Sequence, residues 1–151
     1  MKTPPEAPLP LDELITVDRT PNMRIGEVAA RLGLSHRTLR HYEVEGLVIP
    51  AERTPGGFRL YSALDVQRFL IIMSMRPLDF SLEEIGRLLA GVEEGMSSDP
   101  AERQRGLTVL SEFARQTEER WLALTQKVEI ARSFRSYLSA QTRAPIASRP
   151  R

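Results

Sequence analysis

Residues 35–42 concentrate side chains that can hydrogen-bond to phosphates and to the edges of bases. The segment Ser35-His36-Arg37-Thr38-Leu39-Arg40-His41-Tyr42 leaves few apolar positions besides Leu39. Arg carries a planar fork of donors that fits phosphate oxygens and guanine edges, while Ser, Thr, His and Tyr offer single donors or acceptors. Such a segment needs a rigid element to present it, and the flanking residues predict which one.

Two helices joined by a tight turn are predicted around this segment. Apolar residues recur at helical spacing from Ile25 to Leu32 and predict a first helix there. Gly33 suits a left-handed helix end, and Ser35 suits the N-cap of a second helix that runs to about Val44. This is a helix-turn-helix, which lays its second helix in the major groove of DNA.

A β-hairpin is predicted directly after the two helices. Leu47-Val48-Ile49 reads as a short apolar strand, Pro50 to Gly57 as a turn-rich tip, and Phe58 to Tyr61 as the returning strand. The pair Gly56-Gly57 lets the backbone approach a ligand closely. With Arg residues on both sides of this turn, the hairpin is expected to act as a DNA-contacting wing.

Two further helices are predicted from two capping boxes. Ser62-Ala63-Leu64-Asp65 opens a third helix that Pro77 ends, and Ser81-Leu82-Glu83-Glu84 opens a fourth that Gly91 ends. Both have apolar residues at helical spacing. Residues 23–91 are therefore expected to form one winged helix-turn-helix domain, mainly α-helical.

A long helix is predicted over residues 99–140, after a linker at 92–98. Asp99 is an N-cap before Pro100, and no further proline occurs up to about Ala140. Apolar or small residues recur along it in steps of three and four, the pattern of a coiled coil. They are Leu107, Leu110, Ala114, Thr117, Trp121, Leu124, Val128 and Ala131. We predict a dimerisation helix, with packing back on the chain's own domain as the alternative.

Composition limits the class of protein. The 151 residues can bury one core with room for an extension, and 41% of them are hydrophobic. The chain has no cysteine, which excludes disulfides and thiolate metal sites and fits the cytoplasm. Net charge is only +1, and all but Lys2 and Lys127 of the 21 cations are Arg. The excess of Arg over Lys fits binding to phosphates, and a general bias of the genome toward Arg explains it equally well.

Both ends of the chain are expected to lie outside the folded core. Residues 1–22 contain five prolines, which predicts a disordered or loosely attached tail. Residues 141–151 are expected to form a flexible C-terminal tail. Deletion of residues 1–22 is therefore expected to leave folding and DNA binding intact.

These segments together resemble the MerR family of transcription regulators. The matching pieces are Ile25-Gly26-Glu27, Ser35, Arg37 to Glu43, Gly46-Leu47, Gly57 to Tyr61 and Phe80 to Ile85. The resemblance implies a homodimer in which the long helices pair as an antiparallel coiled coil. It also implies a pseudo-palindromic promoter operator with widely spaced −10 and −35 elements, which the dimer bends and untwists for RNA polymerase.

The resemblance also suggests roles for single residues. His36 and Thr38 occupy variable positions of the family motif and are expected to read bases, and Arg59 on the wing is expected to contact phosphate. Tyr42 resembles a phosphate-contacting tyrosine of the family, with a core aromatic as the alternative, and Tyr61 belongs to the wing motif. The full predicted set is Arg24, Ser35, His36, Arg37, Thr38, Arg40, His41, Tyr42, Arg53, Gly57, Phe58, Arg59 and Tyr61.

Two features depart from the family pattern. Asp79 stands where the family usually has a glycine, in the turn Arg76-Pro77-Leu78-Asp79, which leaves the contribution of a second wing open. The lack of cysteine excludes the mercury-, copper- and redox-sensing modes of the family. A small-molecule effector stays unidentified. The aromatic residues that would either line an effector pocket or pack the core and dimer are Phe113, Trp121, Phe134 and Tyr137.

No enzyme, cofactor or metal site is predicted. His36 and His41 are five residues apart, so on a helix they point about 140° apart and do not form a metal pair. Two alternatives to a transcription regulator remain. One is an architectural or recombination accessory protein that bends DNA, as excisionases do, and the other is a protein-interaction module whose long helix binds a foreign partner.

Overall fold

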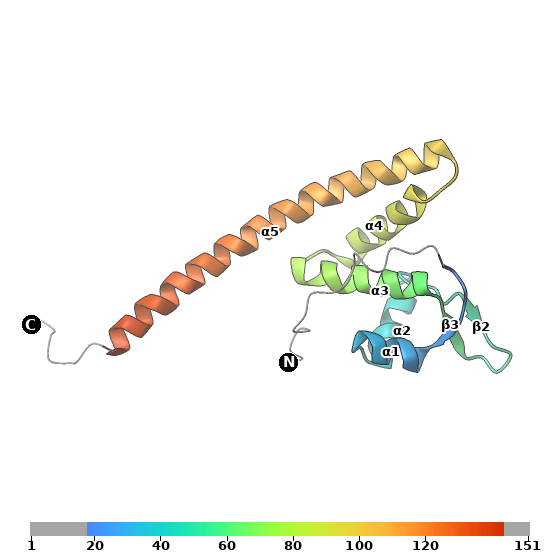
Figure 1. The fold of residues 1–151 in the computed structure, drawn as a ribbon, viewed down its shortest axis with the longest axis horizontal. Helices are drawn as coiled ribbons and strands as arrows, with labels where there is room; N and C mark the ends of the chain where they lie inside the picture. Colours follow the sequence, from blue (N-terminus) through green and yellow to red (C-terminus); the bar gives the residue numbers. More distant parts are fainter. Residues whose placement is uncertain (1–17, 144–151) are drawn as a thin grey trace, which may run out of the picture. The chain divides into compact units, whose positions relative to one another are not determined.

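The computed structural model of the chain describes residues 18–143, so residues 1–17 of the predicted tail at 1–22 and residues 144–151 of the predicted tail at 141–151 lie outside this part. Residues 141–143 belong to the last helix instead of a tail. The elements are helices and one small sheet, which confirms the mainly α-helical class (Figure 1). The chain divides into two compact units, Met1–Ser111 and Glu112–Arg151. Among residues 18–143, no helix is both long and apolar enough to cross a bilayer.

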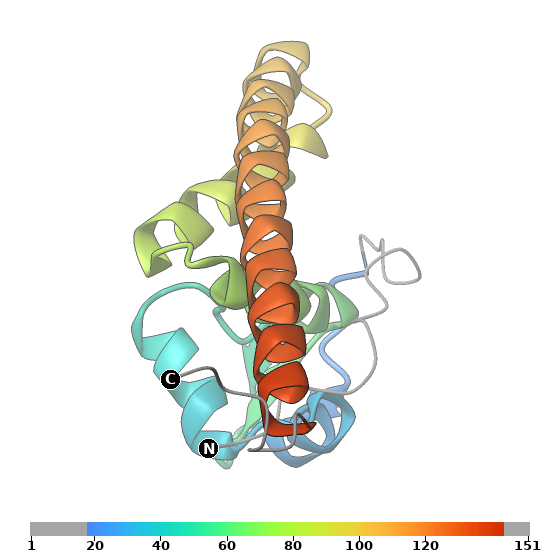
Figure 2. The same cartoon turned by 90° about the vertical axis from the view of Figure 1, so that its left-hand side faces the viewer.

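The helix-turn-helix has the predicted bounds. Helix α1 spans Ile25–Leu32 and helix α2 spans His36–Val44, and the two pack against each other (Figure 2). Gly33 ends α1 with a φ of 65°, in the left-handed region that favours glycine. Ser35 caps α2, because its hydroxyl accepts a hydrogen bond from the Thr38 amide at 3.1 Å.

The wing belongs to a three-stranded antiparallel sheet. Strands β2 (Glu52–Arg53) and β3 (Arg59–Tyr61) form the hairpin, and β1 (Met23–Arg24) pairs with the other edge of β3. Strand β1 was not predicted, since its two residues are too few to show an alternating pattern. It joins the start of α1 directly to the wing.

The predicted strand at residues 47–49 is wrong. Leu47 and Val48 are both buried in the loop after α2, while Ile49 is exposed. Their amides donate to the carbonyl of Tyr42, which completes the end of α2 instead of a sheet ladder. Two consecutive residues in a strand would face opposite sides, so this loop conformation is what lets both enter the core.

The core of the winged domain lies under α3 (Ala63–Met75) and α4 (Leu82–Gly95). Both predicted capping boxes are present: Ser62 and Asp65 begin α3, and Ser81 and Glu84 begin α4. The largest side chains with almost no exposed surface are Tyr61, Phe69, Phe80, Leu39, Ile72, Ile85, Val28, Val48 and Val66. They come from α1, α2, β3, α3 and α4 and from the loops that contain Val48 and Phe80, so one core fixes these four helices against β3.

The turn between α3 and α4 explains the departure at residue 79. The 3-10 turn η2 (Arg76–Leu78) follows α3, and Asp79 then adopts a φ of 59°. This left-handed conformation costs a non-glycine residue about 1–2 kcal/mol, which is the reason a glycine suits this position. Arg76 donates from Nη1 to the Phe80 carbonyl at 3.2 Å and so closes the turn.

Helix α4 is four residues longer than predicted. Gly91 was expected to end it but lies buried inside it, because a Cβ there would come within 2.6 Å of Val109 Cγ1. This glycine allows a close helix crossing and does not terminate the helix. The predicted linker at 92–98 is therefore wrong in its bounds, and the helices are joined by residues 96–99.

Helix α5 is continuous from Pro100 to Arg143. Asp99 caps its start, since Oδ1 accepts from the Ala101 amide at 3.1 Å. Gly106 lies where α5 crosses α4, and a Cβ there would clash with the backbone of Gly95. The glycine lowers helix propensity and in return permits backbone-to-backbone contact.

Candidate nucleic-acid interface

Helix α2 presents an exposed polar surface. His36, Arg37, Arg40 and His41 are exposed, whereas Leu39 between them is fully buried. At 100° per residue the four side chains spread over an arc of about 140° around the helix, and His41 lies 3.9 Å from Glu45 between Nδ1 and Oε1. Within residues 18–143, neither Arg37 nor Arg40 forms an ion pair, so both guanidinium groups are available to an external anion.

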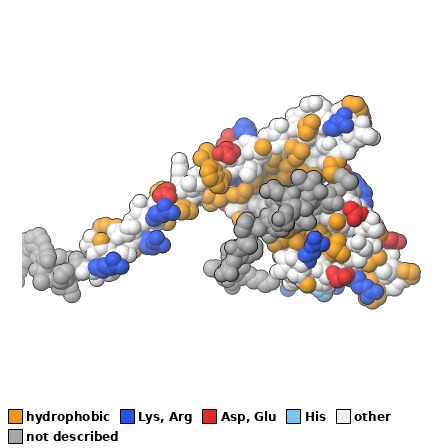
Figure 3. All heavy atoms as spheres, viewed as in Figure 1, with side chains coloured by type: hydrophobic (Ala, Val, Ile, Leu, Met, Phe, Trp, Pro, Cys, Tyr) orange, Lys and Arg blue, Asp and Glu red, His pale blue; other side chains and the backbone are white. Residues whose placement is uncertain are grey.

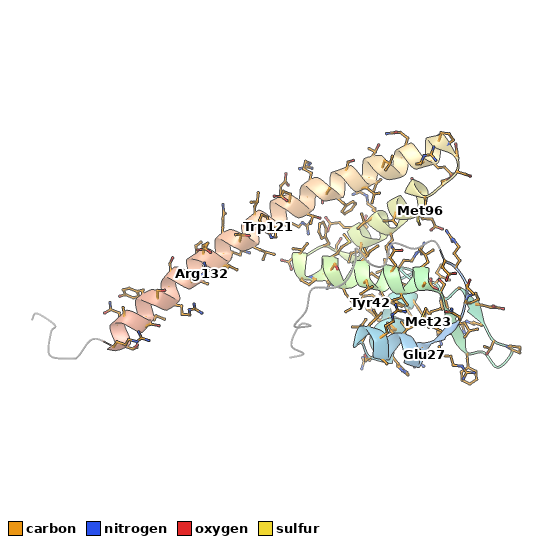
Figure 4. All side chains as sticks on the ribbon, viewed as in Figure 1. Met23, Glu27, Tyr42, Met96, Trp121 and Arg132 are labelled. Carbon is orange, nitrogen blue, oxygen red and sulfur yellow. The ribbon has the colours of Figure 1, made fainter. Side chains whose placement is uncertain are left out.

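Three other predicted residues of α2 are more constrained. Ser35 and Thr38 share a hydrogen bond between their hydroxyls at 2.8 Å, as part of the cap. The ring of Tyr42 is half-buried and lies 6.4 Å from the ring of Phe69 in the core (Figure 4). Tyr42 thus packs on the core and is also partly exposed, and its contact with phosphate stays a prediction.

A carboxylate links α2 to the wing. Glu43 Oε2 accepts from Arg59 Nε at 2.5 Å, and Glu43 Oε1 accepts from the Tyr61 hydroxyl. Only 9% of the Glu43 side chain and 27% of the Arg59 side chain are exposed. Since a charge-assisted pair is strong when partly buried, this contact fixes the wing relative to α2.

Tyr61 is not available to DNA in this structure. Its side chain has no exposed surface, and burial together with the hydrogen bond to Glu43 raises the pKa of its hydroxyl well above the ordinary value. The prediction that Tyr61 contacts DNA is therefore corrected: the residue holds the wing through Glu43. Sequence reasoning gave no role to Glu43, although it is the one carboxylate in the motif run from Arg37 onward.

The wing carries an exposed aromatic ring beside a cation. Phe58 is 60% exposed, and the Arg24 guanidinium lies over its ring at 5.5 Å from the centroid. Arg24, Phe58 and Arg59 line a hollow of about 540 Å³ together with the first turn of α1. The structure thus brings together three predicted site residues from three elements: β1, the hairpin turn and β3.

The tip of the hairpin is a defined turn. Gly57 has a φ of 80°, and its amide donates to the Thr54 carbonyl at 2.8 Å. The Thr54 hydroxyl also accepts a hydrogen bond from the Phe58 amide at 3.1 Å. Arg53 is exposed on β2 beside this tip. Within residues 18–143, no group of three or more His, Cys, Asp or Glu side chains is arranged to hold a metal.

The outer part of α5 exposes an apolar stripe. Trp121 and Val128 are each 54% exposed, and Leu124 is also exposed. Figure 3 shows hydrophobic side chains along this helix between acidic and basic ones, and Figure 4 labels Trp121 on it. From residue 117 to residue 143, apart from the half-covered Arg120, every described side chain is exposed. This helix has no core of its own to cover the stripe.

Comparison with known proteins identifies the family. The family described as "MerR HTH family regulatory protein" matches residues 23–92. The HTH-type transcriptional regulator YfmP of Bacillus subtilis (strain 168) is 35% identical over 125 residues, which cover 77% of this chain and 87% of YfmP. The chain belongs to the MerR family. The resemblance inferred from the motifs is confirmed, as is the prediction that the chain is no enzyme.

Two further relatives define how far the likeness extends. The nodulation protein NolA of Bradyrhizobium sp. (strain NC92) is 48% identical over 68 residues, which cover 45% of this chain and 29% of NolA. The MerR-family chain thus spans less than a third of the length of this relative. The crystal structure of HiNmlR, a MerR family regulator lacking the sensor domain and bound to promoter DNA, has a TM-score of 0.62 at 21% identity. That match covers 80% of this chain and 93% of HiNmlR, and it shows the shared fold.

Proposed function

We propose that this MerR-family protein is a transcription regulator that binds a promoter operator as a homodimer in the cytoplasm. The observation that carries the proposal is the polar face of α2: Arg37 and Arg40 are exposed and unpaired in the described chain. Two exposed guanidinium groups on one helix can neutralise phosphates of a DNA backbone and hydrogen-bond to their oxygens. The wing fixed by Glu43 supplies a second contact surface.

The contacts divide into positioning and reading. The Nε of Arg59 donates a hydrogen bond to Glu43, which leaves the donors on its Nη atoms for a phosphate. Arg24, Arg37, Arg40, Arg53 and Tyr42 are proposed as further phosphate contacts. His36 is exposed at the start of α2 and is the proposed base reader, whereas Thr38 reads bases only if its bond to Ser35 opens.

Dimerisation through α5 is the second part of the proposal. Two antiparallel copies of the helix would bury the stripe that contains Trp121, Leu124 and Val128, which are exposed in the single chain. Burial of apolar surface contributes about 25 cal/mol per Å², so several side chains of this size supply a stable seam. A two-fold dimer then binds a pseudo-palindromic operator, bends and untwists it, and brings RNA polymerase to both promoter elements.

Selection of DNA by the purified protein from a random duplex pool tests this function. A regulator of the proposed kind enriches an inverted repeat, and its affinity falls steeply with salt. Genomic mapping of that repeat to promoters with long spacers supports transcription control, whereas sites away from promoters indicate an architectural protein. Absence of any enriched sequence, with the protein folded, would contradict the proposal.

A further inference from the structure

A short segment that precedes the MerR-family match is built into the winged domain. This N-terminal strap, residues 18–22, is tied at both ends by backbone hydrogen bonds. The Leu64 amide at the start of α3 donates to the Asp18 carbonyl at 3.0 Å, and the Asn22 amide donates to the Tyr61 carbonyl at 3.2 Å. Residues 1–22 were expected to form a disordered or loosely attached tail, and residues 18–22 are attached to β3 and to the start of α3 by these hydrogen bonds.

The middle of the strap reaches the end of α4 through an ion pair. Arg19 Nη2 donates to Glu93 Oε1 at 3.1 Å, and Arg68 Nη2 on α3 donates to Glu93 Oε2 at 2.6 Å. Partial burial acts to raise the pKa of Glu93, but the hydrogen bonds and charges of the two Arg residues hold it below its ordinary value. Glu93 is thus a charged anchor that joins three segments.

The same stretch of α4 carries the first part of α5. A Cβ on Gly106 would clash with the backbone of Gly91 and Gly95, so the two helices touch backbone to backbone at this crossing. Glu94 follows Glu93 in α4, and its Oε2 lies 3.9 Å from Nε of Arg105 on α5. Val109 of α5 also packs against Gly91, so the crossing is close-packed, and a shift of the end of α4 is expected to displace the start of α5.

We infer that the N-terminal strap is a positioning element and that Arg19 is its positioning residue, which acts through Glu93 on the crossing of α4 and α5. The strap holds β3, the start of α3 and the end of α4 in one arrangement. Because the dimer helix begins at this crossing, the strap sets how strictly the protein selects the distance between two operator half-sites. This last step rests on the proposed function.

Hydrogen exchange of the free protein tests the strap without DNA. Deletion of residues 1–22 is compared with deletion of residues 1–17, which leaves the strap intact. Loss of two backbone hydrogen bonds and one ion pair is expected to raise exchange at Leu64 and at residues 92–95 about tenfold in the first variant. The second variant is expected to stay within about twofold of the full chain.

Single substitutions separate the ion pair from the backbone contacts. Arg19→Ala is expected to raise exchange at residues 92–95 about threefold, and Arg19→Lys is expected to restore most of the protection. Arg115→Ala is the matched control, because it removes an equally exposed Arg–Glu pair, 2.6 Å to Glu119, within α5. Unchanged exchange in both Arg19→Ala and the deletion of residues 1–22 would overturn the inference.

Selection from duplexes with half-sites at varied spacing gives the functional readout. Arg19→Ala is expected to broaden the range of accepted spacings while the salt dependence of binding stays the same, since Arg19 is not among the proposed DNA contacts. If Arg19→Ala raises hydrogen exchange but leaves the range of accepted half-site spacings unchanged, the strap only stabilises the fold and its positioning role is refuted. If the full chain selects no DNA, the proposed function fails, and the exchange data still decide whether the strap holds α4.

Discussion

The winged domain and the outer part of α5 hold their shape in opposite ways. In the winged domain, nine side chains of the core have almost no exposed surface, and caps complete the ends of its helices. The outer part of α5 has local ion pairs such as Arg132–Glu129, and its apolar residues are exposed. The first region is stabilised by its own core, while the second carries the proposed dimer surface. Variants in the two regions should therefore differ in what they damage.

The largest contrast is expected between two phenylalanines. Phe69 is fully buried between the rings of Tyr42 and Tyr61, so Phe69→Ala is expected to cost about 3–5 kcal/mol of unfolding free energy. Phe134 is 61% exposed, and Phe134→Ala is expected to change the same quantity by less than about 0.5 kcal/mol. Urea denaturation of both variants gives the comparison, and equal losses would show that α5 is as buried as the core.

The next effect separates the apolar stripe from the rest of α5. Trp121→Asp places a charge in the proposed seam and is expected to weaken the dimer by several kcal/mol, as sedimentation would show by the appearance of monomers. Gln126→Asp adds the same charge five residues along the helix, about 140° away from Trp121, and serves as the control. A dimer that survives Trp121→Asp with unchanged affinity would refute the seam.

Two glycines test the crossing of α4 and α5. Gly106→Ala forces a methyl group into the backbone of Gly95 and is expected to cost about 1–3 kcal/mol despite the better helix propensity of Ala. Gly86 lies in the interior of α4, and a Cβ there would meet only Leu47 Cδ2 at 3.5 Å. Gly86→Ala is therefore expected to stabilise the domain, by up to about 1 kcal/mol in thermal unfolding. Stabilisation by both changes would mean that the crossing is not tight.

The smallest expected effects distinguish the wing from α2 in DNA binding. Arg59→Ala should weaken binding to all sequences alike and lower the salt slope by about one unit, because one phosphate contact is lost. Replacement of His36 should instead change the preferred base at one or two positions, by about 1–3 kcal/mol. Titrations against selected and scrambled duplexes across a salt series measure both. A change of sequence preference in the Arg59 variant would reverse the two roles.

Local sequence signals were sufficient wherever one residue decides a boundary. Ser35, Ser62 and Ser81 were expected at N-caps and occupy them, because a serine hydroxyl satisfies a free amide of the first turn. Gly33 was expected in a left-handed conformation and adopts it. In these cases the interactions that set the end of the helix lie within the residue and its immediate neighbours.

Local signals failed where distant contacts compete. Leu47-Val48-Ile49 has the composition of a strand, but the amides of Leu47 and Val48 donate to Tyr42 of α2. Gly91 is typical of a helix end but packs against Val109 at a helix crossing. Tyr61 fits a DNA-contacting motif, yet it is buried in the core and its hydroxyl donates to Glu43. Gly91 and Tyr61 thus each have a partner far along the chain, 18 residues away for Tyr61, which no short pattern contains.

The sequence by itself determined the order of the five α-helices and the wing, the ends of α1 and α2, the polar surface of α2 and the apolar stripe of α5. These follow from helical periodicity and capping, which act over a few residues. The tertiary structure alone decided the link from Glu43 to the wing and the strap at residues 18–22. The physical reason is that burial and pairing depend on which side chains folding brings together, and those partners are separated by 16 residues for Arg59–Glu43 and 74 for Arg19–Glu93.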